Sequence, residues 1–280
     1  MREQELLAVL VYIQAHLDQP LTLRELASQA GFAPSHFHAE FRRLTRQSPR
    51  QYVQRVRLER AAYLLRLLGD SVLTIALDVG YRTHETFSRA FRRHFRVSPH
   101  KYRRTGEEWP ASSVHGPQPP QGFTLSDTRA RTVNPARIAF IRHTGPYELV
   151  PPELWTRVAA YLAERGYPHD GPRVGIGHDA PNITDASMLR FDAGIIVGEE
   201  VEGHGEVGVQ VLEGGPAAAT THVGPYSSLP QAYPLVFQRA SQLKGFELIG
   251  LPAVEVYHAK VLDPSLGLQY TDIYLPLRRA

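Results

Sequence analysis

The chain has 280 residues, a length that favours two domains over one. It holds no cysteine, which excludes disulfides, thiolate nucleophiles and cysteine-based zinc or iron–sulfur sites. No run of 18 apolar residues predicts a membrane span, and the N-terminal stretch lacks a signal-peptide cleavage site, so a cytoplasmic protein with no membrane partner is expected. Residues 1–105 carry 18 Lys and Arg against 9 Asp and Glu, whereas residues 106–280 carry 13 against 19. This basic first third favours binding to a polyanion.

Residues 21–43 are predicted to form a helix-turn-helix unit. Apolar side chains recur at i, i+3, i+4 and i+7 along its first helix: Leu23, Leu26, Ala27 and Ala30. Gly31 permits the positive φ that commonly ends a helix, and Pro34 stands where a second helix begins. Phe37 and Phe41 are expected to anchor this second helix on the first.

The same pattern returns in residues 72–93. Gly80 takes the place of Gly31, and Phe87 and Phe91 take the places of the earlier phenylalanines. The turn holds one additional residue, and Thr83 is expected to cap the helix that follows it. Residues 48–68 have no internal Pro or Gly after their start, and they predict one long helix between the two units.

The segments RLERAAYLL and TIALDVGYRTHETFSRAFRRHFRVSPHKYR resemble the signature of AraC/XylS-type transcriptional regulators. The resemblance covers residues 6–104. In that family the two units place recognition helices into successive major grooves on one face of the DNA. The resemblance therefore implies binding to double-stranded promoter DNA, and it leaves a contact with RNA polymerase open.

Two groups of side chains are candidates for DNA contact. Outward positions near the starts of the recognition helices are expected to read bases: Ser35, His38, Ala39, His84, Glu85, Thr86 and Arg89. Among them Arg89 suits guanine and Glu85 suits a cytosine amino group, whereas Ala39 offers only apolar contact where the family often has a long basic residue. Basic residues farther along are expected to meet phosphates: Arg42, Arg43, Arg92, Arg93, Lys101, Arg103 and Arg104.

Residues 106–122 are rich in Pro, Gly and Ser and predict a linker between a DNA-binding domain, 1–105, and a second domain, 123–280. Strand-like runs follow at 137–143, 193–201, 252–258 and 272–277, with helical stretches at 151–167 and 229–246. The expected fold class is therefore multidomain, with an all-α N-terminal domain and an α+β C-terminal domain.

The phrase His-x-Gly-Pro-Tyr occurs at residues 143–147 and again at 222–226. Alignment at 79 or 80 residues brings two further pairs into register: His178 with His258, and Asp192 with Asp272. The repeat indicates two copies of a strand, turn, helix, strand, strand unit that cannot bury its sheet face alone. A ligand site is expected at the seam between the copies.

This arrangement resembles the GyrI-like, or gyrase-inhibitor-like, small-molecule-binding domain, and with the basic domain in front it resembles the Rob-type arrangement of AraC-family regulators. The resemblance implies multidrug-type binding of amphipathic or cationic, aromatic effectors, with a carboxylate among aromatic rings. Strand alternation places Glu255 and Tyr257 on one face, and Tyr270 and Tyr274 are expected to turn toward the same groove. The candidate ligand-binding residues are Tyr147, Tyr226, Glu255, Tyr257, Tyr270 and Tyr274.

Cofactors and metal ions are not expected, since the 13 histidines are scattered and two of them, His36 and His38, lie on a recognition helix. Two alternatives to a ligand sensor stay open for the C-terminal domain. The first alternative is a hydrolase with Glu255 as general base beside the tyrosines. The second is a protein-interaction module. A non-enzymatic sensor is favoured, because a sensor fused to a DNA-binding domain gains from keeping its ligand intact.

Overall fold

The computed structural model describes residues 1–104, 122–258 and 269–280. These residues form two compact units, the first of residues 1–104 with 203–208 and the second of residues 122–202, 209–258 and 269–280. The predicted linker 106–122 lies outside the described residues except for Gly122. Within the described ranges, no helix combines the length and the apolar composition needed to cross a membrane.

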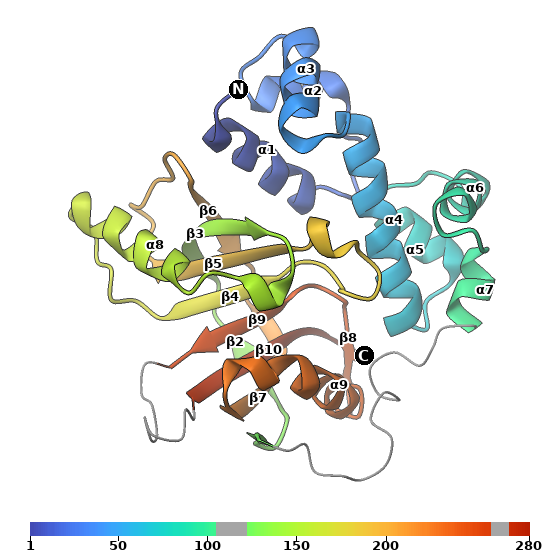
Figure 1. Cartoon of the computed structure of the whole chain (residues 1–280). Coiled ribbons are helices and arrows are strands. Elements are labelled where there is room, and N and C mark those ends of the chain that lie inside the picture. The colour runs from blue at the N-terminus through green and yellow to red at the C-terminus, as the bar shows by residue number, and fades with distance from the viewer. Residues whose placement is uncertain (105–121, 259–268) are drawn as a thin grey trace. The chain divides into compact units, whose positions relative to one another are not determined.

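Residues 1–104 of the first unit form helices and the turns between them, as predicted (Figure 1). Its helices are α1 (Glu3–Ala15), α2 (Leu23–Gln29), α3 (Pro34–Thr45), α4 (Pro49–Leu67), α5 (Val72–Asp78), α6 (His84–Phe95) and α7 (Pro99–Arg104). Two helix-turn-helix pairs, α2–α3 and α5–α6, are joined by the single helix α4. The long helix expected over 48–68 is therefore confirmed.

The turn residues behave as the sequence predicts. Gly31 and Gly80 have φ of 71° and 80°, a conformation that costs glycine little and other residues much. Pro34 occupies the first turn of α3, where its missing N–H is harmless. The Thr83 hydroxyl accepts a hydrogen bond from the Thr86 N–H at 3.2 Å and caps α6.

Buried phenylalanines hold each recognition helix in place. The ring centroids of Phe37 and Phe41 lie 5.4 Å apart with planes inclined at 50°, and those of Phe87 and Phe91 lie 5.4 Å apart at 55°. All four side chains are completely buried. Burial of one such ring contributes about 2–3 kcal/mol. The repeated geometry shows that the two units are built on the same apolar anchor.

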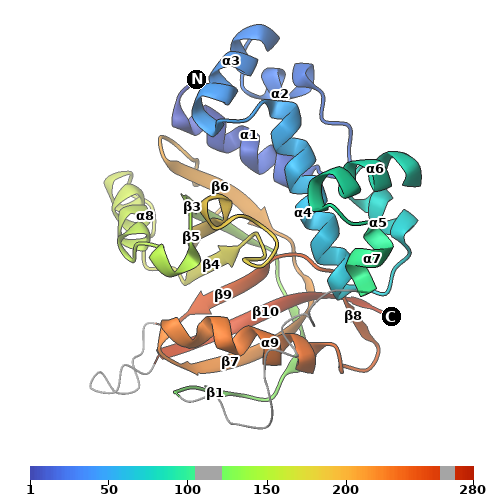
Figure 2. The ribbon, with the colours of Figure 1, turned by 45° about the vertical axis from the view of Figure 1, so that its right-hand side comes forward.

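The second unit is a sheet with two helices (Figures 1 and 2). Its strands are β1 (Thr124–Leu125), β2 (Arg129–Val133), β3 (Ala136–Thr144), β4 (Arg173–Gly177), β5 (Arg190–Val197), β6 (Val207–Leu212), β7 (Gly215–Gly224), β8 (Phe246–Leu248), β9 (Ala253–Tyr257) and β10 (Gln269–Arg279). Helix α8 (Glu153–Glu164) packs on β3 and β5, and α9 (Leu229–Ala240) packs on β7. The strand predicted over 193–201 ends at Val197, where Gly198 begins a turn.

The central strands lie in the order β3-β5-β4-β9-β10-β7. From the outer edge to the seam, each half therefore has its first, third and second strand in the same order. Strands β4 and β9 pair at the seam, and Gly175 lies directly opposite Glu255, the residue 80 positions later. The two aligned His–Asp pairs also form: His178 Nε2 lies 2.6 Å from Asp192 Oδ2, and His258 Nε2 lies 2.9 Å from Asp272 Oδ2. The predicted duplication is therefore confirmed.

Candidate DNA-reading helices and ligand site

The candidate base-reading residues lie near the starts of α3 and α6. Most of them are exposed, and His38 and His84 are half-buried. The Thr86 hydroxyl donates to the Thr83 carbonyl at 3.0 Å, so it is already engaged in the cap. The pKa of Glu85 is lowered, first by a backbone N–H at the start of the helix, and the carboxylate is therefore ionised and able to accept hydrogen bonds.

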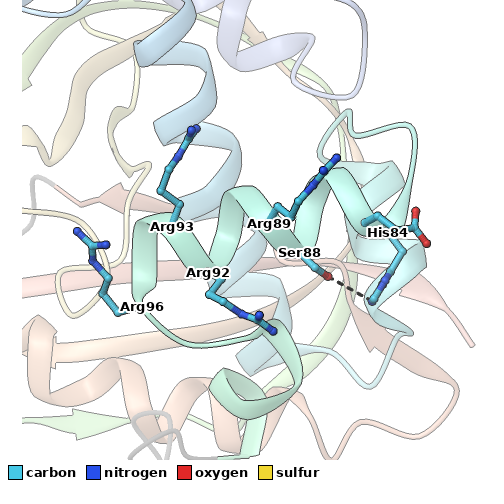
Figure 3. Close-up of a pocket in the computed structure, with 7 residues that line it drawn as sticks. His84, Ser88, Arg89, Arg92, Arg93 and Arg96 are labelled. Atoms are coloured by element: carbon cyan, nitrogen blue, oxygen red, sulfur yellow. Dashed lines mark hydrogen bonds between the residues drawn. The ribbon is translucent and has the colours of Figure 1, made fainter.

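Four exposed arginines form one face of α6: Arg89, Arg92, Arg93 and Arg96. Their spacing of i, i+3, i+4 and i+7 places them on one side of a helix, and with His84, Glu85 and Ser88 they line a hollow on its surface (Figure 3). We call this set the α6 arginine face. Helix α3 carries exposed arginines at three equivalent positions, 50 residues earlier: Arg42, Arg43 and Arg46.

Arg46 and Arg96 were not among the residues predicted from sequence. Each is the residue that ends its recognition helix, with φ of 61° and 63° respectively. This left-handed conformation is uncommon for a residue with a side chain. The 50-residue offset that relates the two units also relates these arginines. This offset is the signal in the sequence that could have found them.

The residues expected to contact phosphates differ in the exposure of their side chains and in the partners that these side chains already have. Arg42, Arg92, Arg93 and Lys101 are exposed. Arg43 is also exposed, and its NH2 lies 3.0 Å from Glu40 Oε2. Arg103 departs from the expectation, because its half-buried guanidinium donates to the Leu65 carbonyl at 3.3 Å and the Asp70 carbonyl at 2.5 Å. This arginine holds α7 against the end of α4.

In the second unit, Glu255 lies on the face of the sheet that the helices cover. Its cross-strand partners are Gly175 on β4 and Ile273 on β10. The side chain is only 7% exposed. Tyr233 of α9 donates its hydroxyl to Glu255 Oε1 at 2.5 Å, and the Tyr257 hydroxyl donates to Oε2. Two tyrosines from different elements therefore cover the carboxylate.

Aromatic rings surround these hydroxyls. The Tyr257 ring centroid lies 5.1 Å from that of Tyr226 and 5.3 Å from that of Trp155, both in edge-on contact. A Cβ at Gly175 would collide with the Tyr257 hydroxyl and the Phe191 ring, so the absent side chain makes room for these aromatics. Tyr226 is 42% exposed and forms the open side of this aromatic group.

The electrostatics of this site are unusual for a carboxylate. Burial raises the pKa of Glu255 above its ordinary value, and hydrogen bonds from the two tyrosines oppose the rise only in part. No basic side chain of the described residues contributes to this shift. Burial next to the carboxylate also raises the pKa of Tyr257 well above 10. The site therefore favours a positive charge that none of the described residues supplies.

The expectation that Tyr270 and Tyr274 face this carboxylate is wrong. Directly paired residues of antiparallel strands point to the same face of a sheet. Glu255 pairs with Ile273, while Tyr274 pairs with Val254, so both tyrosines of β10 lie on the opposite face. The sequence analysis placed each strand's alternation correctly but not the register between the strands.

Two further tyrosines lie near this site: Tyr147, whose ligand contact stays a prediction, and Tyr233. The Tyr147 hydroxyl accepts from the Asp179 N–H at 2.9 Å and donates to the Asp179 carbonyl, and burial raises its pKa, so this ring holds a neighbouring loop. Tyr233, which contacts Glu255, was missed. It stands four residues after buried Leu229 and three before buried Val236, so the 3.6-residue period of α9 already placed it near the sheet.

Two family models match the chain. A helix-turn-helix domain matches residues 26–105, and a GyrI-like small molecule binding domain matches residues 126–278, more than half of the chain. The right origin-binding protein of Escherichia coli K12 is 34% identical over 125 residues, which are 45% of this chain and 43% of that protein. The regulatory protein SoxS of Salmonella typhimurium is 36% identical over 104 residues, 37% of this chain and 97% of SoxS.

Among solved structures, the C-terminal domain of AraT, a response regulator from Geobacillus stearothermophilus, has 31% identity and a TM-score of 0.37, over 40% of this chain and 93% of that one. The chain matches less than half the length of the right origin-binding protein. The chain belongs to the family of GyrI-like small-molecule-binding domains, and its helical unit is an AraC-type helix-turn-helix domain, the Rob-type arrangement.

Proposed function

We propose that this protein is a transcription regulator of the AraC family. Residues 1–105 bind promoter DNA through α3 and α6, and residues 123–280 bind a small lipophilic cation that modulates the regulator. The proposal includes a contact with RNA polymerase, and it includes no turnover of the ligand. Its support comes from the family matches and from the two sites described above.

The α6 arginine face and its counterpart on α3 carry the DNA-binding part of this proposal. Within them, the exposed guanidinium groups of Arg92, Arg93 and Arg96 suit the phosphates that flank a major groove. Arg89 and Glu85 lie closer to the helix start, where side chains reach base edges. The two sets have different roles, since phosphate contacts set affinity and base contacts set sequence preference.

A mobility-shift assay with promoter fragments and with random DNA of equal length tests this part. At physiological salt we expect a target fragment to bind at least about 1,000-fold more tightly than random DNA. The Arg89→Ala variant is expected to lose about 1–3 kcal/mol on the target and to bind random DNA almost unchanged. Equal affinity of the protein for all fragments would overturn the assignment.

The Glu255 carboxylate carries the ligand-binding part. A buried carboxylate without a basic partner is costly, and a bound cation offsets this cost. The electron-rich faces of Tyr226, Tyr257 and Trp155 add cation–π attraction to a ligand beside the carboxylate. Tyr226, the most exposed of these rings, offers the first contact for an arriving ligand.

Tetraphenylphosphonium is a suitable probe, with the neutral triphenylphosphine oxide as control. We expect the phosphonium to raise the melting temperature of the full chain and the neutral compound to have no effect. The Glu255→Gln variant keeps the shape of the side chain and is expected to lose the gain. Stabilisation of both proteins by the phosphonium would remove Glu255 from the ligand site.

Sensing and turnover are distinguished by mass spectrometry of ester-bearing cations incubated with the protein. A sensor returns the cation unchanged, whereas a hydrolase releases products in amounts exceeding the protein. Run-off transcription with RNA polymerase then measures whether the added cation changes promoter output.

A further inference from the structure

A row of polar side chains continues from the Glu255 site into the second half of the sheet. Tyr257 of β9 lies opposite Thr271 of β10, and Thr271 lies opposite His222 of β7. Because directly paired residues share a face, all three side chains lie on the helix-covered face. Of the three, Tyr257 contacts the carboxylate, and the other two follow it away from the seam. Thr271 and His222 are both completely buried.

The hydrogen bonds of His222 define which ring nitrogen carries the proton. His222 Nε2 lies 2.8 Å from Ser228 Oγ. The Ser228 hydroxyl donates its one hydrogen to the Pro225 carbonyl at 2.7 Å, so it can only accept from the imidazole. His222 Nε2 is therefore the protonated nitrogen, and Nδ1 presents a lone pair. Burial lowers the pKa of His222 and favours this neutral form.

Two polar atoms of this row have no hydrogen-bond partner among the described residues: His222 Nδ1 and Thr271 Oγ1. A buried polar atom without a partner disfavours the ligand-free state. Both atoms belong to neighbouring strands on one face, and they extend the hydrogen-bonding surface that begins at Tyr257. A ligand group that meets them recovers this cost on binding.

The first half of the sheet keeps the histidine of this row, His143, whose Nε2 also has no hydrogen-bond partner among the described residues, but it lacks the threonine. The position equivalent to Thr271, 80 residues earlier, is Phe191. Its ring centroid lies 5.8 Å from that of Tyr147 and 6.1 Å from that of Trp155, in an apolar aromatic group. The position of Thr271 is therefore aromatic in the first half and polar in the second, with Glu255 between the two.

We propose that the ligand carries, in addition to its cationic centre, a hydroxyl or N–H group that donates to His222 Nδ1 beside the Thr271 hydroxyl. Its apolar rings then lie toward Trp155 and Phe191, and its polar end lies toward β7. This inference rests on the proposed function of the Glu255 site. It narrows the effector from any lipophilic cation to an amphipathic cation with a hydrogen-bond donor at one end.

Titration calorimetry with three probes tests the inference: tetraphenylphosphonium and its analogues with one 3-hydroxyphenyl or one 4-hydroxyphenyl ring. We expect at least one hydroxylated probe to bind the full chain at least about fivefold more tightly than the parent, the gain of one hydrogen bond. In Thr271→Val and in His222→Gln this advantage is expected to fall below about twofold.

The variants are matched to the atoms that they remove. Valine keeps the shape of Thr271 without its hydroxyl, and glutamine retains a donor in place of His222 Nε2 while lacking Nδ1. Thr271→Ser restores the hydroxyl and is expected to restore the advantage, which separates a ligand contact from a change in packing. Binding of the parent phosphonium to Thr271→Val is expected to change less than about twofold.

These measurements distinguish a failure of the proposed cation site at Glu255 from a failure of the proposed contact with His222 and Thr271. Equal affinity of all three probes, each abolished by Glu255→Gln, would overturn the donor-binding row and leave the cation site standing. A parent phosphonium that binds without dependence on Glu255 would overturn the cation site, and the further inference would fall with it. A hydroxyl advantage that survives both Thr271→Val and His222→Gln also overturns the inference.

Discussion

Two buried carboxylates of the second unit have opposite surroundings. Asp192 accepts from Arg142 Nε at 2.7 Å, from Gln210 at 2.8 Å and from His178 at 2.6 Å. Burial alone would raise the pKa of Asp192, but Arg142 and His178 hold it well below its ordinary value. Glu255 has tyrosine hydroxyls and no basic partner among the described residues. The fold therefore neutralises the first carboxylate, whereas the second has the surroundings that we propose a cationic ligand completes.

The duplication supplies a matched test of the buried ion pair. Asp192→Ala leaves the guanidinium of Arg142 buried without its carboxylate, and we expect a loss of about 3–5 kcal/mol in the free energy of unfolding. The equivalent Asp272, 25% exposed, is paired with His258, 46% exposed. Asp272→Ala is therefore expected to cost less than about 1 kcal/mol. Urea unfolding followed by circular dichroism measures both, and equal losses would contradict the difference in burial.

Glu255→Gln is expected to stabilise the ligand-free protein at neutral pH. The folded pKa of Glu255 is raised, so the folded state binds its proton more tightly than the unfolded state and stability falls as pH rises. Glutamine removes this loss. The gain in melting temperature is expected at pH 8 and should vanish below the ordinary carboxyl pKa of about 4.3.

The control for this titration is Glu199→Gln, which changes an exposed carboxylate of the same unit. Its difference from the unmodified protein should not follow the same course with pH. A Glu255→Gln difference that is flat from pH 4 to 8 would show that the carboxylate is solvated in the folded protein.

The sequence predicted the role of a single residue correctly where that role depends only on neighbours along the chain. Gly31, Gly80, Pro34 and Thr83 act within one turn, and each was placed correctly. Tyr270 and Tyr274 were assigned to the wrong face, because a residue's neighbours across a sheet depend on the pairing of two strands. Local periodicity carries no information on that register.

At the scale of elements, α6 is a helix with one phenylalanine face and one arginine face. Phe87 and Phe91 are buried, while the arginines recur on the opposite positions and remain exposed. The hydrophobic period predicted both the helix and its orientation on the core. Arg96, which the sequence analysis left out, follows the last helical residue in the left-handed conformation and remains exposed beside the helix.

The arginine face predicts a specific dependence on salt. If Arg92 and Arg96 each meet a phosphate, then Arg92→Gln and Arg96→Gln should each lower the slope of log affinity against log salt by about 0.9. The double variant should lower it by about 1.8 without altering the preferred sequence.

Fluorescence anisotropy over a range of salt concentrations measures these slopes. Arg165→Gln, an arginine of the second unit, is the control and is expected to leave the slope unchanged. An unchanged slope in both α6 variants would mean that this face does not meet the DNA backbone.

At the scale of the whole molecule, each of the two units contains two copies of one pattern, but the second copy differs from the first in different ways. In the helical unit the copies are joined through α4 and keep the same anchor and three equivalent exposed arginines. In the sheet the copies meet edge to edge, and replacing Gly175 by Glu255 and Phe191 by Thr271 makes the seam asymmetric. Repeat spacing predicted both duplications from the sequence.

The continuity of α4 leads to a last prediction, on the spacing of the DNA site. This helix has 19 residues and no internal break, so it spans about 28 Å and holds α3 and α6 at a fixed separation. Successive major grooves on one face of DNA are about 34 Å apart.

Insertion of 5 base pairs between the two half-sites turns one groove away, and insertion of 10 doubles the distance that the recognition helices must cover. We expect both insertions to reduce affinity, measured by mobility shift, to the level of random DNA. An insertion of 10 base pairs outside the half-sites should have no effect. Recovery of affinity with 10 base pairs between them would mean that α4 bends or unfolds on DNA, because only a flexible connection could reach the more distant groove.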